Sequence, residues 1–146
     1  MVKYDKYIAW GSTVLETKLI EEVDQLFIVK DYKKVIEILT KELLATPNNA
    51  KLNYYCASAH DALGLEREAI PYYEMALLNE VEGEMREETY VQLGSSYRCI
   101  GEYEEAKRVL YRGAEELPNN QAISLLLARV YFDSREEACG GGGGVC

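Results

Sequence analysis

The stretch from Tyr90 to Ala106 reads YVQLGSSYRCIGEYEEA, and its spacing of large and small residues decides the fold. Two aromatic residues, a leucine and a glycine occur at positions i, i+3, i+4 and i+7, which share one face of an α-helix. They are Tyr90, Leu93, Gly94 and Tyr97. Gly101 interrupts the pattern, as glycine commonly does just after a helix. The stretch therefore predicts a helix, a tight turn and the start of a second helix.

The same pattern recurs along the chain. Aligning Gly101 with Gly64, 37 residues earlier, brings LNYYCASAHDALGLEREAIPYYEMAL into register with TYVQLGSSYRCIGEYEEAKRVLYRGA. A third copy lies upstream, because the tripeptide PNN starts at Pro47 and again at Pro118, 71 residues later. One unit is thus about 34 residues long, with three additional residues in the middle unit. Asn119 or Asn120 is expected to cap a further helix, QAISLLLARVYF, which repeats the first helix of a unit.

Small residues recur where neighbouring helices are expected to touch. Gly94 lies where the first helix of its unit must pack against the second, and Ala106 is the expected facing residue. Gly113 is expected to let the second helix approach the next unit. Larger side chains at these positions would push the helices beyond the usual separation of about 8–10 Å. The sequence therefore predicts an all-α fold of antiparallel helix pairs.

On these residues the chain resembles the tetratricopeptide repeat (TPR) family. The third unit shows the motif residues Tyr90, Leu93, Gly94, Tyr97, Gly101, Tyr103, Ala106, Gly113 and Pro118. The second unit shows Ala57, Gly64, Ala69, Tyr73 and Ala76. The first unit departs from the pattern, since Lys30 replaces the turn glycine and Glu42 replaces a small residue. The resemblance covers about residues 16–132 and implies a right-handed α-solenoid of about three and a half repeats.

The predicted array has units at about 16–49, 50–86 and 87–120 and a half unit at 121–138. Residues 1–15 precede it as an expected capping element, with a bend at Gly11-Ser12 that would fold the N-terminal residues back over the first repeat. Those N-terminal residues include Tyr4, Tyr7, Ile8 and Trp10. In the half unit, REEA at 135–138 predicts the opening of a second helix, as YEEA does at 103–106.

The tail at 139–146, CGGGGGVC, cannot continue a helix, because each glycine costs about 1 kcal/mol relative to alanine. Two interpretations of this tail remain open. It is either a flexible end, a linker or a remnant of expression, or a loop that Cys139 and Cys146 close as a disulfide.

Composition excludes several kinds of partner. The 16 Lys and Arg residues face 25 Asp and Glu residues, a formal net charge of −9, so nucleic acid and anionic membranes would on average repel the chain. No apolar run reaches the length of a membrane span, and the N-terminus lacks the apolar centre of a signal peptide. We therefore expect a cytoplasmic protein with neither a membrane nor a nucleic-acid partner.

Catalysis and metal binding have little support in the sequence. The single histidine, His60, aligns with the packing position of Tyr97 and is expected to be a core residue. Cys56 and Cys99 are expected to be reduced structural thiols, because no cysteine cluster has metal-ligand spacing. No nucleophile or metalloprotease signature occurs. We expect neither an enzyme nor a cofactor.

The resemblance implies where a partner would bind. In TPR proteins the first helix of each pair lines a concave face that holds an extended peptide or a partner helix. Carried onto this sequence, the predicted groove residues are Ile20, Asp24, Phe27, Tyr54, Ser58, Asp61, Val91, Ser95, Arg98, Leu125, Arg129 and Phe132. Arg98 and Arg129 are either acid-binding groups in this groove or salt-bridge partners of nearby acidic residues.

Chaperone-binding members of the family clamp a C-terminal carboxylate with a Lys-Asn-Asn-Lys-Arg set. The corresponding positions here are Ile20, Asp24, Ser58, Val91 and Ser95. The resemblance therefore predicts a noncatalytic protein-interaction scaffold without that clamp. An alternative is a homodimer formed through the unfinished last repeat, because residues 121–132 are apolar nearly all round.

Overall fold

The computed structural model describes residues 2–138, and it describes side chains from residue 14 onward. Within residues 2–138 the chain forms seven α-helices and no strand. They are α1 (Val2–Ile28), α2 (Tyr32–Ala45), α3 (Ala50–Ala62), α4 (Glu66–Leu78), α5 (Gly83–Cys99), α6 (Tyr103–Glu116) and α7 (Gln121–Ala138). The all-α prediction is confirmed. None of these helices combines the length and the apolar character that a membrane crossing requires.

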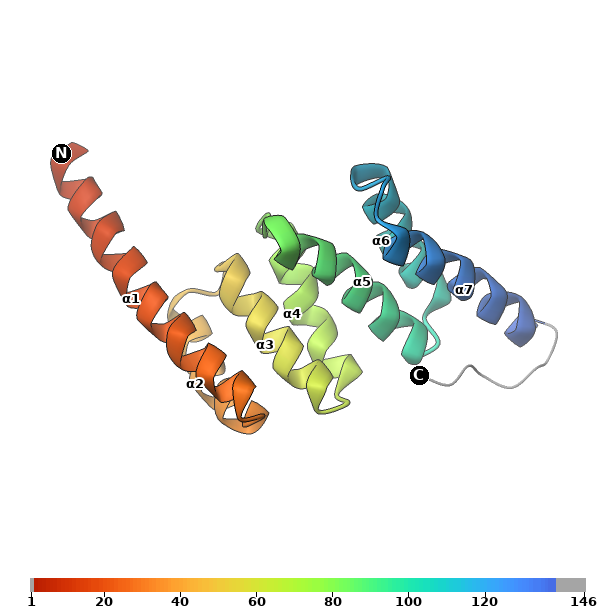
Figure 1. Ribbon diagram of the computed structural model, residues 1–146, viewed down its shortest axis with the longest axis horizontal. Helices are drawn as coiled ribbons and strands as arrows, with labels where there is room; N and C mark the ends of the chain where they lie inside the picture. The colour runs from red at the N-terminus through yellow and green to blue at the C-terminus, as the bar shows by residue number, and fades with distance from the viewer. Residues whose placement is uncertain (1, 139–146) are drawn as a thin grey trace.

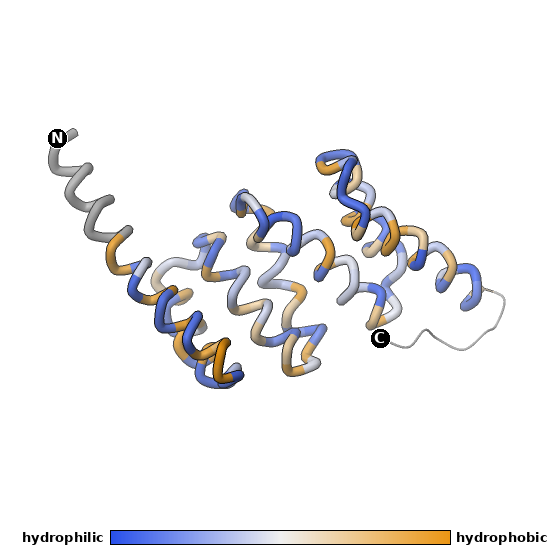
Figure 2. The backbone as a smooth tube through the Cα atoms, viewed as in Figure 1, coloured by the Kyte–Doolittle hydropathy of each residue, from blue (hydrophilic) through white to orange (hydrophobic). Residues whose placement is uncertain are grey.

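The helices form antiparallel pairs that stack into an elongated solenoid (Figure 1). The odd-numbered helices α1, α3, α5 and α7 lie in the layer nearer the viewer, and the even-numbered helices lie behind them. Each helix packs on the next along the chain, and α5 also contacts both α3 and α7. Figure 2 shows hydrophobic and hydrophilic residues alternating along the described helices, as expected where one side of each helix is buried.

The buried core runs between the two layers as two clusters. The larger cluster joins α3 to α7 and includes Tyr73, Tyr90, Leu93 and Leu110. The smaller cluster joins α1, α2 and α3 and includes Val23, Val35, Leu39, Leu52 and Cys56. Tyr72 packs against both clusters. Fully burying a leucine-sized side chain contributes about 1.5–3 kcal/mol, so these clusters supply most of the stability.

Left-handed backbone closes the turns inside the helix pairs. Gly64 and Gly101 adopt φ values of +74° and +79°, and each lies one residue beyond the C-cap of its helix, Leu63 for α3 and Ile100 for α5. This confirms the predicted role of Gly101. Lys30 holds the equivalent turn of the first pair with a φ of 60°, although a side chain in this conformation costs about 1–2 kcal/mol.

Two glycines allow α5 and α6 to approach closely. A Cβ added at Gly94 would lie 2.5 Å from Cδ2 of Leu110, and one added at Gly113 would lie 2.9 Å from Cγ of Tyr90. Both contacts join α5 and α6 of one unit. The predicted role of Gly94 is confirmed, but the residue that it faces most closely is Leu110 rather than Ala106. The prediction that Gly113 faces the next unit is wrong, because its nearest neighbour is in its own unit.

Both ends of the array differ from the prediction. α1 continues as one helix from Val2 through Gly11-Ser12, so the predicted bend is absent. In Figure 1 this helix projects past the end of α2. α7 runs unbroken to Ala138, so REEA is its last turn and does not open a second helix. The side chains of Tyr4, Tyr7, Ile8 and Trp10, and the two interpretations of residues 139–146, lie outside the described residues.

Asparagine side chains start two of the odd-numbered helices. The Asn49 Oδ1 accepts a hydrogen bond from the Leu52 backbone N–H at 3.0 Å, and the Asn120 Oδ1 accepts one from the Ile123 N–H at 3.1 Å. Each bond satisfies a backbone donor that has no partner inside the helix. Of the two predicted cap residues, Asn119 and Asn120, it is Asn120 that caps α7.

Candidate functional site

Two adjoining hollows open between the odd-numbered helices. The first lies between α3 and α5, has a volume of about 360 Å³, and is lined by Tyr54, Ser58, Asp61, Ala62, Tyr73, Glu88 and Gln92. The second lies between α5 and α7, has a volume of about 370 Å³, and is lined by Glu84, Glu87, Glu88, Val91, Gln92, Asn120 and Ala122. Glu88 and Gln92 line both hollows. We call this continuous surface across three helices the groove.

Helical spacing brings these side chains together. Tyr54, Ser58 and Asp61 occupy positions i, i+4 and i+7 of α3, so they lie on one face of that helix. On α5 the same spacing places Glu84, Glu88 and Val91 in a row. The repeat register then sets the row on α3 beside the row on α5.

Four of the residues predicted from the sequence line the groove. These are Tyr54, Ser58, Asp61 and Val91. Ser95 is half-buried on α5, beyond the two hollows. The structure thus brings together the central part of the predicted set.

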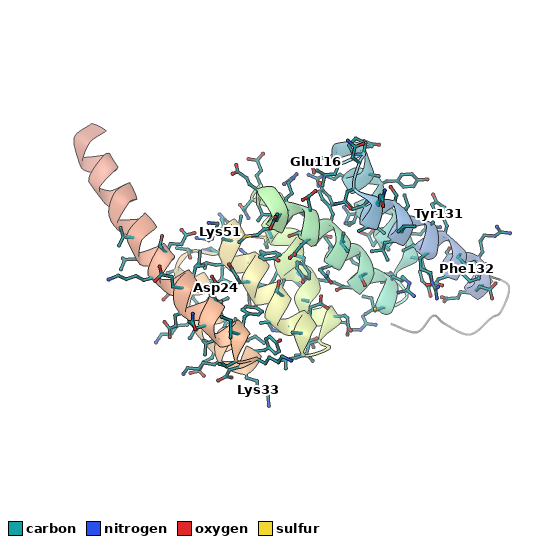
Figure 3. The ribbon with its side chains drawn as sticks, in the orientation of Figure 1. Asp24, Lys33, Lys51, Glu116, Tyr131 and Phe132 are labelled. Carbon is teal, nitrogen blue, oxygen red and sulfur yellow. The ribbon has the colours of Figure 1, made fainter. Side chains whose placement is uncertain are left out.

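The predicted residues on α1 lie elsewhere. Ile20 and Phe27 pack against the smaller core cluster, and the Phe27 ring lies 5.6 Å from that of Tyr32, centroid to centroid. Asp24 is exposed (labelled in Figure 3), and its carboxylate adds to the effect of burial in raising the pKa of Tyr55 to about 12.

The predicted residues on α7 do not line the two hollows. Leu125 is 71% exposed and Phe132 is 57% exposed. Figure 3 shows Phe132 on α7, at the end of the array. Their exposure leaves apolar side chains on the surface of α7.

Arg98 and Arg129 converge on one buried carboxylate. The Arg98 Nε donates to Asp133 Oδ2 at 2.5 Å, and the Arg129 Nε lies 3.2 Å from Asp133 Oδ1. The Asp133 side chain is 5% exposed and that of Arg98 is 12% exposed. Of the two interpretations of these arginines, the structure shows salt-bridge partners. Asp133 itself was not predicted, because its pairing with Arg98 spans 35 residues and depends on how α5 and α7 pack.

Neutral hydrogen-bond donors hold the groove carboxylates. The Tyr54 hydroxyl donates to Glu88 Oε2, the Tyr73 hydroxyl donates to Asp61 Oδ2 at 3.2 Å, and the Asn120 Nδ2 donates to Glu87 Oε1 at 3.4 Å. Burial, followed by these carboxylates, raises the pKa of both Tyr54 and Tyr73 above the ordinary value. Both hydroxyls therefore remain protonated donors at neutral pH.

Burial also acts on a carboxyl group in the groove. It raises the pKa of Asp61 above its ordinary value, and the hydrogen bond from Tyr73 opposes that rise only in part. The nearby charge of Glu66 raises this pKa further. The charged form of Asp61 is thus less favourable here than in water.

Sequence reasoning missed the carboxylates at the entrance of the second hollow. Glu84 and Glu87 lie in the first two turns of α5, where the helix dipole alone accounts for acidic residues. The detectable signal was the i, i+4 spacing of Glu84 and Glu88, which puts Glu84 on the groove side of the helix.

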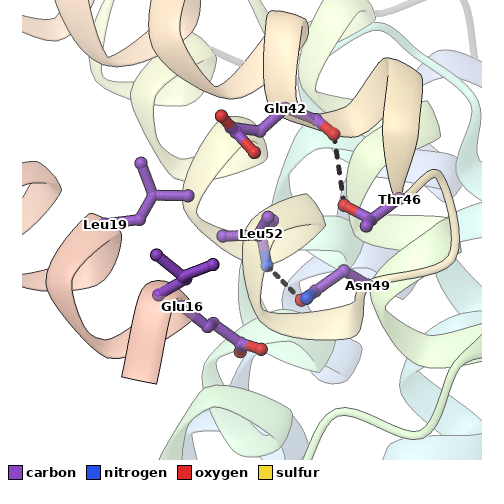
Figure 4. A pocket seen from close by; sticks show the side chains of 7 residues that line it. Glu16, Leu19, Glu42, Thr46, Asn49 and Leu52 are labelled. Atoms are coloured by element: carbon purple, nitrogen blue, oxygen red, sulfur yellow. Dashed lines mark hydrogen bonds between the residues drawn. The ribbon is translucent and has the colours of Figure 1, made fainter. Parts of the chain in front are cut away.

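A separate hollow of about 420 Å³ lies between α1, α2 and α3 (Figure 4), lined by Leu15, Glu16, Leu19, Glu42, Thr46, Asn49 and Leu52. Its hydrogen bonds terminate helices. The Thr46 hydroxyl donates to the Glu42 carbonyl at 3.2 Å, and Asn49 caps α3. Those two polar side chains are thus already engaged.

The histidine and the cysteines, which are the residue types most often used in catalysis or metal binding, lie in structural positions. His60 is buried, its ring stacks on Tyr72 at 5.2 Å, and its Nδ1 donates to the Cys56 carbonyl at 2.8 Å. This confirms the predicted core role. Cys56 is free and buried, and burial raises its pKa to about 12. Cys99 is disulfide-bonded, so the prediction of a reduced thiol is wrong there. No group of three potential metal ligands occurs among the described residues.

The comparisons with known proteins agree with this architecture. A family model described as Tetratrico peptide repeat matches residues 50–139, which is more than half of the chain. The chain therefore belongs to the tetratricopeptide repeat family. A search of curated proteins found no match.

Solved structures show the same fold. The Sgt2 TPR domain from Aspergillus fumigatus superposes with a TM-score of 0.72 at 23% identity, over 89% of this chain and 85% of that chain. The first TPR domain of Spaghetti (RPAP3), bound to the HSP90 peptide SRMEEVD, gives a TM-score of 0.68 at 24% identity, over 86% of this chain and 93% of that chain. At these identities the similarity establishes the fold alone.

Proposed function

We propose that this chain is a noncatalytic interaction module that holds an extended peptide or a helix of another protein in the groove. One observation carries the proposal. The two hollows share Glu88 and Gln92, so a continuous surface crosses α3, α5 and α7. A surface that spans several repeats suits an extended ligand better than a compact small molecule.

The similar Spaghetti domain supports a peptide as the ligand type, since that structure contains a bound peptide. Its acidic HSP90 peptide is not the ligand that we propose here. The clamp positions hold Ile20, Asp24, Ser58, Val91 and Ser95, none of which is basic. An acidic C-terminus would meet no fixed cation at these positions.

A random peptide library displayed on phage tests the proposal. The selection is run in parallel on the full chain and on its Gln92→Trp variant, because Gln92 is exposed and lines both hollows. We expect peptides to be enriched on the unmodified protein and to lose binding to the variant, whose helical circular dichroism should be unchanged. Peptides that bind both proteins equally would place the binding surface elsewhere.

A second proposal, self-association through α7, rests on a different observation. The helix exposes Leu125 and Phe132, and Leu126 and Leu127 beside them are only partly buried. Apolar side chains clustered on the surface of one helix favour contact with a second copy. Sedimentation equilibrium at micromolar concentrations tests it, and a mass that stays monomeric would rule out strong association.

A further inference from the structure

The groove carries negative charge without a basic residue among its lining side chains. Asp61, Glu84, Glu87 and Glu88 contribute four carboxylates, and neither hollow is lined by lysine, arginine or histidine. Lys51, at the start of α3, is exposed and lines neither hollow. Within the two hollows a ligand would thus meet charges of one sign, although Lys51 lies on the same face of α3 as Tyr54 and Ser58.

Several carboxylates outside the groove, in the described part of the chain, form ion pairs with arginine. Asp133 pairs with Arg98 at 2.5 Å, Glu116 with Arg86 at 2.8 Å, and Glu74 with Arg108 at 2.9 Å. The groove carboxylates have no such ion pair within residues 14–138. Their contacts are the tyrosine hydroxyls and the amide described above, which fix the position of a carboxylate and leave its charge uncompensated.

This arrangement has a clear electrostatic consequence. Three of the carboxylates are already oriented, so an incoming cation would not have to order them or displace an existing ion pair. An incoming anion would be repelled by all four. The partly desolvated environment, which also raises the pKa of Asp61, strengthens any charge pair formed inside the hollow.

We propose that the partner segment is basic: an extended peptide whose lysine or arginine side chains enter the two hollows and pair with Asp61, Glu84, Glu87 and Glu88. This inference rests on the proposed function, because it assigns the chemistry of a ligand for the same groove. Its physical basis is charge complementarity to a preorganised, hollowed acidic surface.

Two triple variants that change the net charge equally distinguish an effect of the groove carboxylates from an effect of the net charge of the protein. Glu84→Gln, Glu87→Gln and Glu88→Gln remove three of the four groove carboxylates, whereas Glu115→Gln, Glu136→Gln and Glu137→Gln remove three exposed carboxylates outside the groove. The probes are a short synthetic peptide that alternates lysine with alanine and its glutamate counterpart, measured by calorimetry at low ionic strength. The single variant Glu84→Gln is a second test, because Glu84 is exposed and its change should not affect folding.

We expect the lysine peptide to bind the unmodified chain and to bind the groove triple variant about tenfold more weakly, with a smaller loss for Glu84→Gln alone. The control triple variant should bind within about twofold of the unmodified chain, because its carboxylates are far from the ligand and screened by salt. The glutamate peptide should not bind. Equal weakening by both triple variants, binding of the glutamate peptide, or no binding of the lysine peptide would overturn the inference.

The phage selection distinguishes failure of this inference from failure of the proposed function. Enriched peptides that require an open groove but contain no excess of lysine or arginine would refute the basic partner and leave the groove as a binding site. No enrichment beyond that on the Gln92→Trp variant would refute both.

Discussion

The contact between Gly94 and Leu110 sets the distance between α5 and α6. Leu110 is fully buried, so its side chain has no free volume to move into. The repeat alignment predicted that Gly94 must be small, because Ala57 occupies the same position in the second unit. It did not predict Leu110 as the neighbour, since that depends on side-chain packing in the folded chain.

We predict that Gly94→Ala destabilises the protein by about 1–2 kcal/mol. Overpacking against Leu110 costs about 1–3 kcal/mol, and the better helix propensity of alanine returns up to about 1 kcal/mol. Urea unfolding measures the net effect. In a Leu110→Ala background the same change should cost nothing, since the clashing atoms are gone. A gain in stability in the unmodified background would contradict the packing argument.

Asp61 provides a test by pH. Its pKa is raised in the folded protein, so the charged form costs stability above that pKa. The cost falls as the pH drops through the folded pKa and is gone below the ordinary value of the unfolded chain. We therefore predict that Asp61→Asn is more stable than the unmodified protein at pH 7, and that the difference vanishes near about pH 3.

Urea titrations across this pH range measure the difference. The asparagine introduced in that variant could still accept the hydrogen bond from the Tyr73 hydroxyl through its amide oxygen, so the hydrogen bond is not the variable. A variant that is less stable at pH 7 would show that burial does not dominate at Asp61. Glu115→Gln changes an exposed residue and serves as the control. It should leave the free energy of unfolding unchanged at both ends of the pH range.

Most of the helix ends could be predicted from the glycine and proline residues next to them. The structure confirms that helices end next to Gly64, Gly101, Pro47 and Pro118. Glycine readily adopts the positive φ value found just after a helix, and proline is common shortly after a helix end. The two ends of the array could not be predicted in the same way. Gly11-Ser12 is tolerated inside α1 at a cost of about 1 kcal/mol for the glycine. No glycine or proline separates Phe132 from Arg135, so α7 simply continues.

The asparagine cap of α3 gives a prediction for the stability of a single helix. Asn49→Ala removes the bond to the Leu52 N–H and should lower the free energy of unfolding by about 1 kcal/mol. The neighbouring exposed Asn48 makes no side-chain bond among those described, so Asn48→Ala should change it by less than about 0.5 kcal/mol. Thermal unfolding of both variants measures the two changes. Equal losses of stability would show that the Asn49 cap does not stabilise α3.

For the molecule as a whole, the fold class followed from the repeat, and the resemblance to the TPR family predicted the three residues on α3 that line a hollow, Tyr54, Ser58 and Asp61. The groove's charge did not follow from the repeat, because Asp61 on α3 and the three glutamates on α5 (Glu84, Glu87 and Glu88) come together only after the solenoid has formed. Arg98 could not be assigned either, since its partner Asp133 lies 35 residues later on α7. For Arg129, the i, i+4 spacing to Asp133 was a signal available in the sequence.

The exposed face of α7 leads to a prediction about assembly. If two copies associate there, Leu125→Ser and Phe132→Ser should each weaken the dimer by more than about tenfold, since each buried apolar side chain contributes about 1.5–3 kcal/mol. Analytical ultracentrifugation over a concentration series gives the dissociation constants. Leu44→Ser is the matched control, because Leu44 is 85% exposed on α2, and it should leave association unchanged.

The division of the core into two clusters has a consequence for how the molecule opens. Stability in a stacked array is a sum of neighbouring contributions, so a weak junction lets one end fray while the rest remains closed. Tyr72 is the side chain that packs against both clusters. Backbone amides of α1 and α2 should therefore exchange with deuterium through a partial opening, and those of α5 and α6 only through complete unfolding.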